Sequence, residues 1–161
     1  MARTPRKPPA PLPQIGWREW IHLADLGAVS VKAKIDTGAK TSAIHAWKIL
    51  EKEVGDQLFV TFDLHPHQRT KRGAVSCSAL VIDRRLVRNS GGTQQARYVI
   101  VTPAKIGAHI LNIELGLTQR DEMGFRMLLG REAFRGRFLV DAAGSFYSGI
   151  PYRPSKTGDP Q

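Results

Sequence analysis

Asp36, Thr37 and Gly38 are consecutive and offer three groups from which acid–base chemistry can be built. A carboxyl group can take up or release a proton, and a threonine hydroxyl can both donate and accept a hydrogen bond. Glycine has no Cβ, so backbone amides beside it can approach a carboxylate closely. The plainer interpretation of the same three residues is a strand end followed by an Asx turn.

The residues before Asp36 alternate in polarity. In residues 31–35, valine, alanine and isoleucine are separated by two lysines. Successive side chains of a β-strand point to opposite faces, so this pattern gives one apolar and one polar face. The sequence predicts a strand that buries its apolar face and carries Asp36 on the other.

Two separate segments carry a family resemblance. Residues 36–39 resemble the catalytic loop of the aspartic proteases, in particular the retropepsin-like ones with one such loop per chain. Residues 127–134 resemble the hydrophobic strand, glycine, arginine and short helix that follow later in retropepsins. More specifically, residues 33–46, 128–131 and 140–141 resemble the bacterial family named for an ATP-dependent zinc protease, which often occurs with ATP-grasp ligases that add glutamates to proteins. The resemblance extends from about residue 17 to residue 146.

This resemblance implies a mainly β fold, namely a retropepsin-like acid-protease β-barrel with one short C-terminal helix and one catalytic loop per chain. Asp36, Thr37 and Gly38 would be the catalytic residues, with Thr37 locking paired loops together and Gly38 letting amides support the carboxylates. The chain departs from the viral pattern after Ala39, because Lys40 and Thr41 replace acidic residues that can pair with the arginine of the second motif. Arg131 is therefore expected to have another partner.

A single Asp-Thr-Gly triplet predicts a homodimer. Aspartic-protease chemistry needs two carboxyl groups that share one proton, since like charges about 3 Å apart cannot both ionise. The only similar segment, residues 141–144, lacks the hydroxyl residue and the spacing. The second carboxyl group is therefore expected from Asp36 of another copy, with the active site lying on the two-fold axis.

The charge balance points to an acidic substrate. The chain holds 24 Lys and Arg against 14 Asp and Glu, a net charge of +10. Residues 1–13 contribute +3 and residues 153–161 contribute +1, which leaves +6 on the body between them. Seven of these basic residues and one acidic residue lie between positions 69 and 97. A positive body favours an acidic, glutamate-rich or glutamate-tailed protein substrate, and the alternative is a non-catalytic module of the same fold that binds acidic protein or RNA.

A polar, glycine-containing segment at 88–93 predicts a hairpin tip, which is either an ordinary surface hairpin or a flap that closes over substrate. The residues expected to bind substrate lie in this segment and beside the catalytic triplet: Ala39, Lys40, Arg88, Ser90, Gly91 and Gly92.

Patterning divides the chain into a basic, proline-rich disordered tail (1–13), one protease domain (14–152) and a second disordered tail (153–161). Strands are expected at 16–23, 31–36, 56–63, 74–87, 96–101, 110–115 and 138–140, and a helix at 132–135. Residues 42–47 suit a strand or one turn of helix, and the resemblance favours the strand.

No cofactor is predicted. The chain has neither a Gly-x-x-x-x-Gly-Lys-Ser/Thr phosphate loop nor a His-Glu-x-x-His pair, so neither ATP nor zinc has a site in the sequence. His65 and His67 lack partners at a zinc spacing and are expected in a polar loop. Cys77 is the only cysteine, and no apolar segment follows the basic first residues, so a cytoplasmic location is expected, with no membrane contact.

Overall fold

The computed structural model describes residues 11–67, 71–88, 91–119 and 124–151. Within the predicted tails, residues 1–10 and 153–161 lie outside these ranges. Among the described residues, no helix has the length and apolar character needed to cross a membrane.

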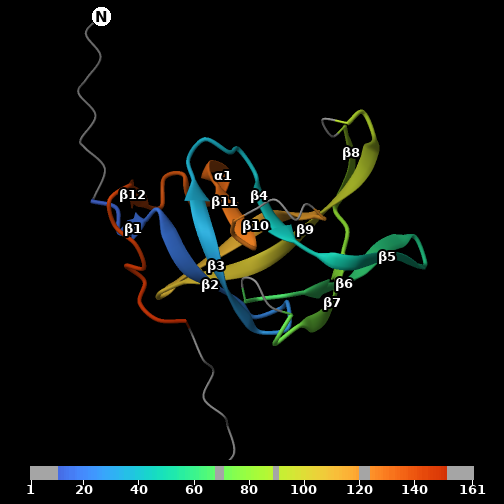
Figure 1. Ribbon diagram of the computed structural model, residues 1–161, viewed down its shortest axis with the longest axis horizontal. Helices are drawn as coiled ribbons and strands as arrows, with labels where there is room; N and C mark the ends of the chain where they lie inside the picture. The colour runs from blue at the N-terminus through green and yellow to red at the C-terminus, as the bar shows by residue number, and fades with distance from the viewer. Residues whose placement is uncertain (1–10, 68–70, 89–90, 120–123, 152–161) are drawn as a thin grey trace, which may run out of the picture.

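A closed barrel of six strands forms the body of the molecule (Figure 1). Its strands follow the order β10-β4-β11-β3-β2-β9, and β9 pairs again with β10 to close it. They are β2 (Arg18–Leu23), β3 (Val29–Asp36), β4 (Ser42–His45), β9 (Gln94–Ile106), β10 (His109–Thr118) and β11 (Met127–Gly130). The mainly β, barrel-forming prediction is confirmed.

The remaining elements surround the barrel. β8 (Asp83–Arg88) pairs with β9 and projects from the barrel as a hairpin (Figure 1). β5 (Trp47–Val54), β6 (Gln57–Leu64) and β7 (Val75–Leu80) form a separate three-stranded sheet. β1 (Gln14–Gly16) and β12 (Leu139–Asp141) pair in parallel, and α1 (Arg131–Phe134) is the short helix that the sequence predicts.

Alternation along β3 supplies part of the barrel core. Val29, Val31, Ala33 and Ile35 are buried, whereas the residues between them face outward. Side chains of β10 and β11 pack into the same cluster, including Leu115, Leu117, Met127 and Leu129. The prediction that the apolar face of this strand is buried is therefore confirmed.

Two predicted strands are each divided into two, because their halves pair with different partners. The 16–23 strand is interrupted at Trp17: β1 pairs with β12, whereas β2 pairs with β3. The 74–87 strand is interrupted at Val81 and Ile82, where the chain crosses from β6 to β9. Residues 42–47 are strand, as the resemblance favours, with a break at Ala46 between β4 and β5.

A stack of three rings fastens the three-stranded sheet to the barrel. The ring of Trp47 lies 3.8 Å from that of His45 and 3.8 Å from that of His65, and all three are nearly parallel. The guanidinium group of Arg126 lies 4.8 Å from the Trp47 ring. Residues 65–67 form no strand, as predicted, but His65 is buried rather than part of an exposed polar loop.

The stack predicts acid sensitivity. Burial, followed by the positive charges of Arg126 and Lys71, lowers the pKa of His65 below its ordinary value of 6.5. The unfolded chain then binds the proton more readily, so stability contributed by neutral His65 is complete above about pH 6.5 and is lost as the pH falls through the folded pKa. Urea unfolding at pH 7.5 and 5.5 should show a smaller loss of unfolding free energy on acidification in His65→Phe than in the wild type. Equal losses would contradict this role for His65.

Candidate active site

Asp36 is the last residue of β3 and its side chain is partly exposed. The amide of Gly38 donates to Asp36 Oδ1 at 3.0 Å, and the amide of Ala39 donates to the Asp36 carbonyl at 3.2 Å. A Cβ on Gly38 would lie 3.3 Å from Asp36 Oδ1. The predicted close approach of backbone to carboxylate is therefore present. Thr37 and Gly38 are exposed beside it.

The Asp36 loop (residues 36–41) is held by the second motif. β11 runs parallel to β3, with Gly130 opposite Asp36, and antiparallel to β4. The chain between β3 and β4 must therefore cross the end of β11. Backbone amides of α1 bind the underside of the loop: Arg131 N donates to Ala39 O at 2.8 Å and Glu132 N to Lys40 O at 3.2 Å.

Arg131 has a partner that the sequence did not identify. Its Nη1 donates to the Gly38 carbonyl at 3.3 Å, in the absence of acidic residues after Ala39. The guanidinium group thus braces the same loop through a backbone oxygen. Every residue has a backbone carbonyl group, so the residue types do not indicate which one accepts from Arg131. Only the structure could identify this partner.

Gly130 is the tightest point of the support. A Cβ here would lie 2.4 Å from the Thr41 carbonyl oxygen, and its amide donates to Ser42 Oγ at 3.0 Å. Gly130→Ala should displace the Asp36 loop, lower the unfolding free energy by about 2 kcal/mol and reduce any activity that depends on Asp36. Gly124→Ala is the matched control, since nothing lies within 4 Å of a Cβ there. Equal urea midpoints for the two variants would show that the Asp36 loop accommodates a Cβ at residue 130 without loss of stability.

The predicted substrate-binding residues fall into two groups. Ala39 is half-buried and Lys40 is exposed in the Asp36 loop. Gly91 and Gly92 lie in the turn between β8 and β9, with Gly92 in the left-handed region at φ +79°. Arg88 ends β8 opposite Gln94, whereas Ser90 lies outside the described residues. In Figure 1 this hairpin and the Asp36 loop both project toward the upper side of the view.

A cleft of about 430 Å³ lies between the Asp36 loop and β8, and of the predicted substrate-binding residues only Lys40 is among those that line it. Lys40 and Thr41 from the loop, Arg85 from β8, Glu114 from β10 and Glu132 from α1 contribute to its walls. Arg85 belongs to the basic run at 69–97, but nothing in the sequence distinguishes it from the other arginines. Its Nε lies 2.7 Å from Asp83 Oδ2, and Glu132 is paired with Arg135. The cleft therefore has mixed charge, with Lys40 on its loop side.

Asp141 already has structural partners. The Ala143 amide donates to its Oδ1 at 2.8 Å, and the Tyr147 hydroxyl donates to its Oδ2. These hydrogen bonds, that from Tyr147 first, lower the pKa of Asp141. The carboxylate fastens residues 141–147, which agrees with the sequence argument that this segment is not a second catalytic loop.

Glu19 is a structural residue that sequence reasoning missed. Its carboxylate is fully buried and accepts four hydrogen bonds. The amides of Gly16 and Tyr147 donate to Oε2 at 2.9 and 3.0 Å, and the amide and hydroxyl of Ser148 donate to Oε1 at 2.9 and 2.6 Å. A signal existed, because alternation places Glu19 on the same face of its strand as Ile21.

Among the described residues, no three His, Cys, Asp or Glu side chains lie together in an arrangement suited to a metal ion. The rings of His45 and His65 are stacked on Trp47 instead.

Comparisons with known proteins agree with this geometry. Residues 14–149 match the model of the RimB-like family, described as the retropepsin-like aspartic endopeptidase RimB. The crystal structure of Lpg0085 from Legionella pneumophila, a protein of unknown function, superimposes with a TM-score of 0.71 at 28% identity. The match covers 84% of this chain and 98% of that one.

Two curated relatives carry a different name. The chain is 45% identical over 129 residues to a "Probable alpha-L-glutamate ligase" of Desulfotalea psychrophila, and 44% identical over 135 residues to one of Shewanella halifaxensis. These matches cover 80% and 84% of this chain but only 28% and 30% of the relatives. The likeness to the ligases thus concerns less than a third of their length. On the match over residues 14–149, the chain belongs to the RimB-like family of retropepsin-like aspartic endopeptidases.

Proposed function

We propose that this protein is a homodimeric aspartic peptidase that hydrolyses peptide bonds in acidic, glutamate-rich or glutamate-tailed protein. The observation that carries the proposal is the partly exposed Asp36 carboxylate, held by the Gly38 amide on a loop braced by α1. The Asp36 carboxylate is therefore held in one position at the surface of the chain. In a two-fold symmetric dimer, the Asp36 carboxyl groups of the two copies could lie side by side.

The chemistry follows from two such carboxyl groups. An ionised Asp36 takes a proton from water while the protonated Asp36 of the second copy donates a hydrogen bond to the scissile carbonyl. The water oxygen bonds to the carbonyl carbon and forms a tetrahedral intermediate. The C–N bond then breaks as the amine nitrogen receives the proton that Asp36 took from the water, which leaves one carboxylic acid and one amine. Thr37 of each copy is proposed to hold the paired loops together.

The substrate class rests on charge and on the relatives. Lys40 stands in the Asp36 loop, and the β8–β9 hairpin carries basic residues. In the two relatives, a region similar to this chain forms part of a protein named as a glutamate ligase. A functional link to an ATP-grasp glutamate ligase is therefore part of the proposal, with one protein adding glutamates and the other removing them. A cytoplasmic setting suits the single, buried Cys77 thiol.

The test compares two fluorescent peptides of equal length, one ending in a run of α-linked glutamates and the other in glutamines. Purified wild type should cleave the glutamate peptide faster, with products identified by mass spectrometry and the dimer measured by sedimentation. Raising the ionic strength should reduce the difference, because salt screens attraction between exposed charges. Tight binding of the glutamate peptide by a dimer that cleaves neither would instead support the non-catalytic binding module.

A further inference from the structure

The outer face of β2 and β3 carries a row of cations. Cross-strand register places Arg18 opposite Lys34 and Trp20 opposite Lys32, all on the face turned away from the core. On the neighbouring strand β9, Lys105 pairs with His22 at the end of the row. We call Arg18, Lys32, Lys34 and Lys105 the basic stripe. Among the outward residues of β2 and β3 the first acidic one is Asp36 itself.

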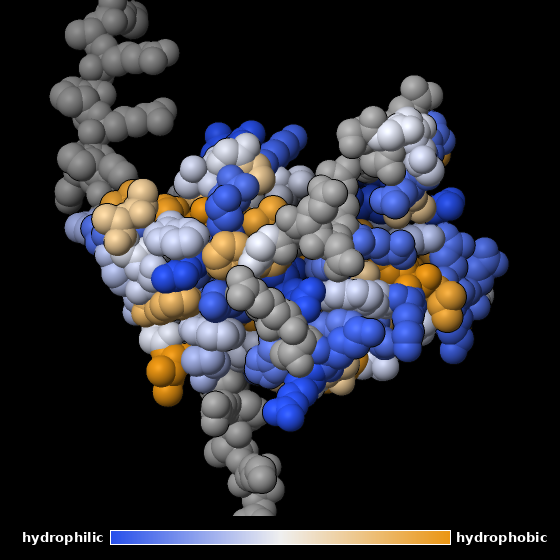
Figure 2. Space-filling model, viewed as in Figure 1, coloured by the Kyte–Doolittle hydropathy of each residue, from blue (hydrophilic) through white to orange (hydrophobic). Residues whose placement is uncertain are grey.

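Aromatic rings lie against two of the four cations of the stripe, Arg18 and Lys32. The Arg18 guanidinium lies 4.8 Å from the Trp17 ring and 5.0 Å from the Phe146 ring. The Lys32 ammonium lies 5.8 Å from Trp20 and 5.9 Å from Phe146, and these two rings stack on each other. Figure 2 shows hydrophilic and apolar residues interleaved over β2 and β3. The chain's own cations thus cover ring faces on which nucleobases would have to stack.

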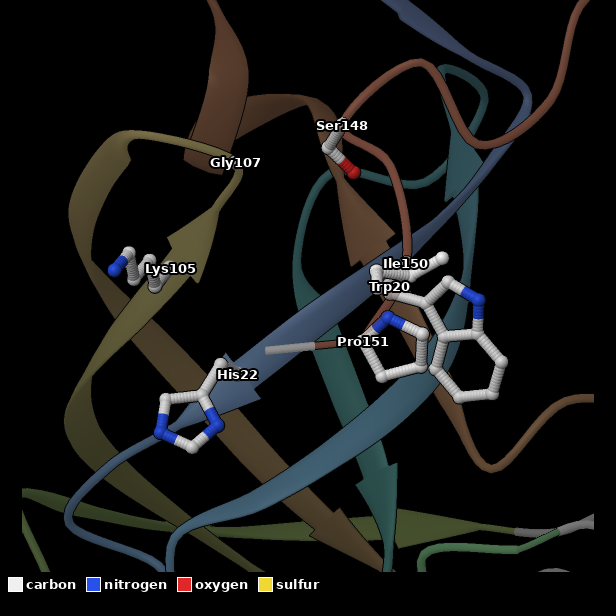
Figure 3. Close-up of a pocket in the computed structure, with 7 residues that line it drawn as sticks. All are labelled: Trp20, His22, Lys105, Gly107, Ser148, Ile150 and Pro151. Atoms are coloured by element: carbon white, nitrogen blue, oxygen red, sulfur yellow. The ribbon is translucent and has the colours of Figure 1, made fainter. Parts of the chain in front are cut away.

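A pocket of about 320 Å³ opens where the stripe ends (Figure 3). Trp20 and Ile150 line one side, and His22 and Lys105 lie on the other. Burial, and then the charge of Lys105, lowers the pKa of His22 and so favours the neutral imidazole. An apolar wall facing an ammonium group suits a side chain with a methylene stem and a carboxylate, such as glutamate.

The stripe also has the period of an extended peptide. Lys32, Lys34 and Asp36 are alternate residues of β3, so about 6.6 Å separates each from the next along the strand. Every second side chain of an extended peptide has the same spacing. In a substrate peptide that lies along β3, alternate glutamate side chains point to the same side. Each of these glutamates would therefore lie beside one lysine of β3, and the peptide would run toward Asp36.

We propose that the basic stripe and its pocket form an exosite for the acidic segment of a protein substrate. The inference deepens the proposed function and rests on it for the identity of the substrate. An acidic peptide is favoured over RNA because ammonium and guanidinium groups, rather than open ring faces, are what the surface presents. Carboxylates bound along β3 would place the adjoining peptide bond at the Asp36 loop.

The experiment measures fluorescence anisotropy of the glutamate-tailed peptide in an Asp36→Asn background, which prevents cleavage from disturbing the binding curve. Lys32→Gln combined with Lys105→Gln is expected to weaken binding by about tenfold and to flatten its salt dependence. Lys32→Arg should restore binding in part, because it returns the charge. Lys52→Gln on β5 is the matched control, since Lys52 is an exposed strand lysine of another sheet.

The outcomes separate this inference from the proposed function. If wild type cleaves the glutamate peptide but the double variant binds it as tightly as its parent, the exosite is wrong and the peptidase stands. If the double variant loses binding although wild type cleaves nothing, the exosite stands without the peptidase. Loss of affinity for a single-stranded RNA oligonucleotide alone would overturn the assignment to acidic peptide. Thermal melting of the double variant shows whether its fold is intact.

Discussion

Asp36→Asn should reduce hydrolysis of a glutamate-tailed peptide by about 10²- to 10⁴-fold while leaving the fold intact. Asparagine keeps the shape of the side chain and an oxygen that can accept from the Gly38 amide, 3.0 Å away in the native loop. It cannot take a proton from water. The measurement is kcat/KM by product chromatography, with urea unfolding to confirm stability. Asp56→Asn, in the exposed turn between β5 and β6, is the control and should retain full activity.

The same variant tests whether two chains share one site. If chains exchange freely, a fivefold excess of Asp36→Asn leaves each wild-type chain with a wild-type partner about one time in six, and activity should fall in that proportion. Wild-type activity that is indifferent to the excess variant would mean that each chain works alone. The mixing result would then contradict the shared carboxyl pair even if Asp36 proved essential.

Glu19→Gln should lower the unfolding free energy by about 3 kcal/mol. Each oxygen of the Glu19 carboxylate accepts two hydrogen bonds. The glutamine side chain has an NH₂ group in place of one of these oxygens, so two donors would face a donor instead of an acceptor. Each buried donor left without an acceptor costs about 1–3 kcal/mol. Urea unfolding at neutral pH measures the loss.

The matched control for this variant is Glu114→Gln, the same substitution at an exposed position of β10, where the change should stay within about 0.5 kcal/mol. If both variants unfold at the same urea concentration, the four hydrogen bonds of Glu19 contribute little. In Glu19→Gln the backbone amides of residues 144–148 should also exchange hydrogen faster than in the wild type. If stability falls while their exchange rates stay unchanged, the loss does not come from the hydrogen bonds between Glu19 and this segment.

The Asp36 loop could be predicted because its information is local. Three consecutive residues mark the candidate site, the alternation before them predicts the strand, and the resemblance of residues 127–134 to a retropepsin element predicts the second motif and its short helix. Each of these features uses neighbours in sequence. For the same reason the buried face of β3 and the short helix after β11 were predictable.

The strand breaks at Trp17 and at Val81 were not predictable, because partners far along the chain decide them. Trp17 N donates to Gly144 O, and Val81 N donates to Leu58 O, at 2.9 and 2.8 Å. Propensity along one segment carries no information about such partners. His65, which follows β6, is likewise buried against the ring of Trp47 at the start of β5, a partner that its own segment does not reveal.

The position of β11 between β3 and β4 limits how much of the barrel can form while the chain is being synthesised. Both neighbours of this strand lie in the first third of the chain, whereas β11 itself comes only at Met127–Gly130. On the ribosome, the gap between β3 and β4 must therefore stay unfilled until residue 130 has emerged, and the Asp36 loop has no brace before then. Such long-range pairing makes folding slow, and an incomplete nascent chain that lacks β11 and α1 has no support for its Asp36 loop.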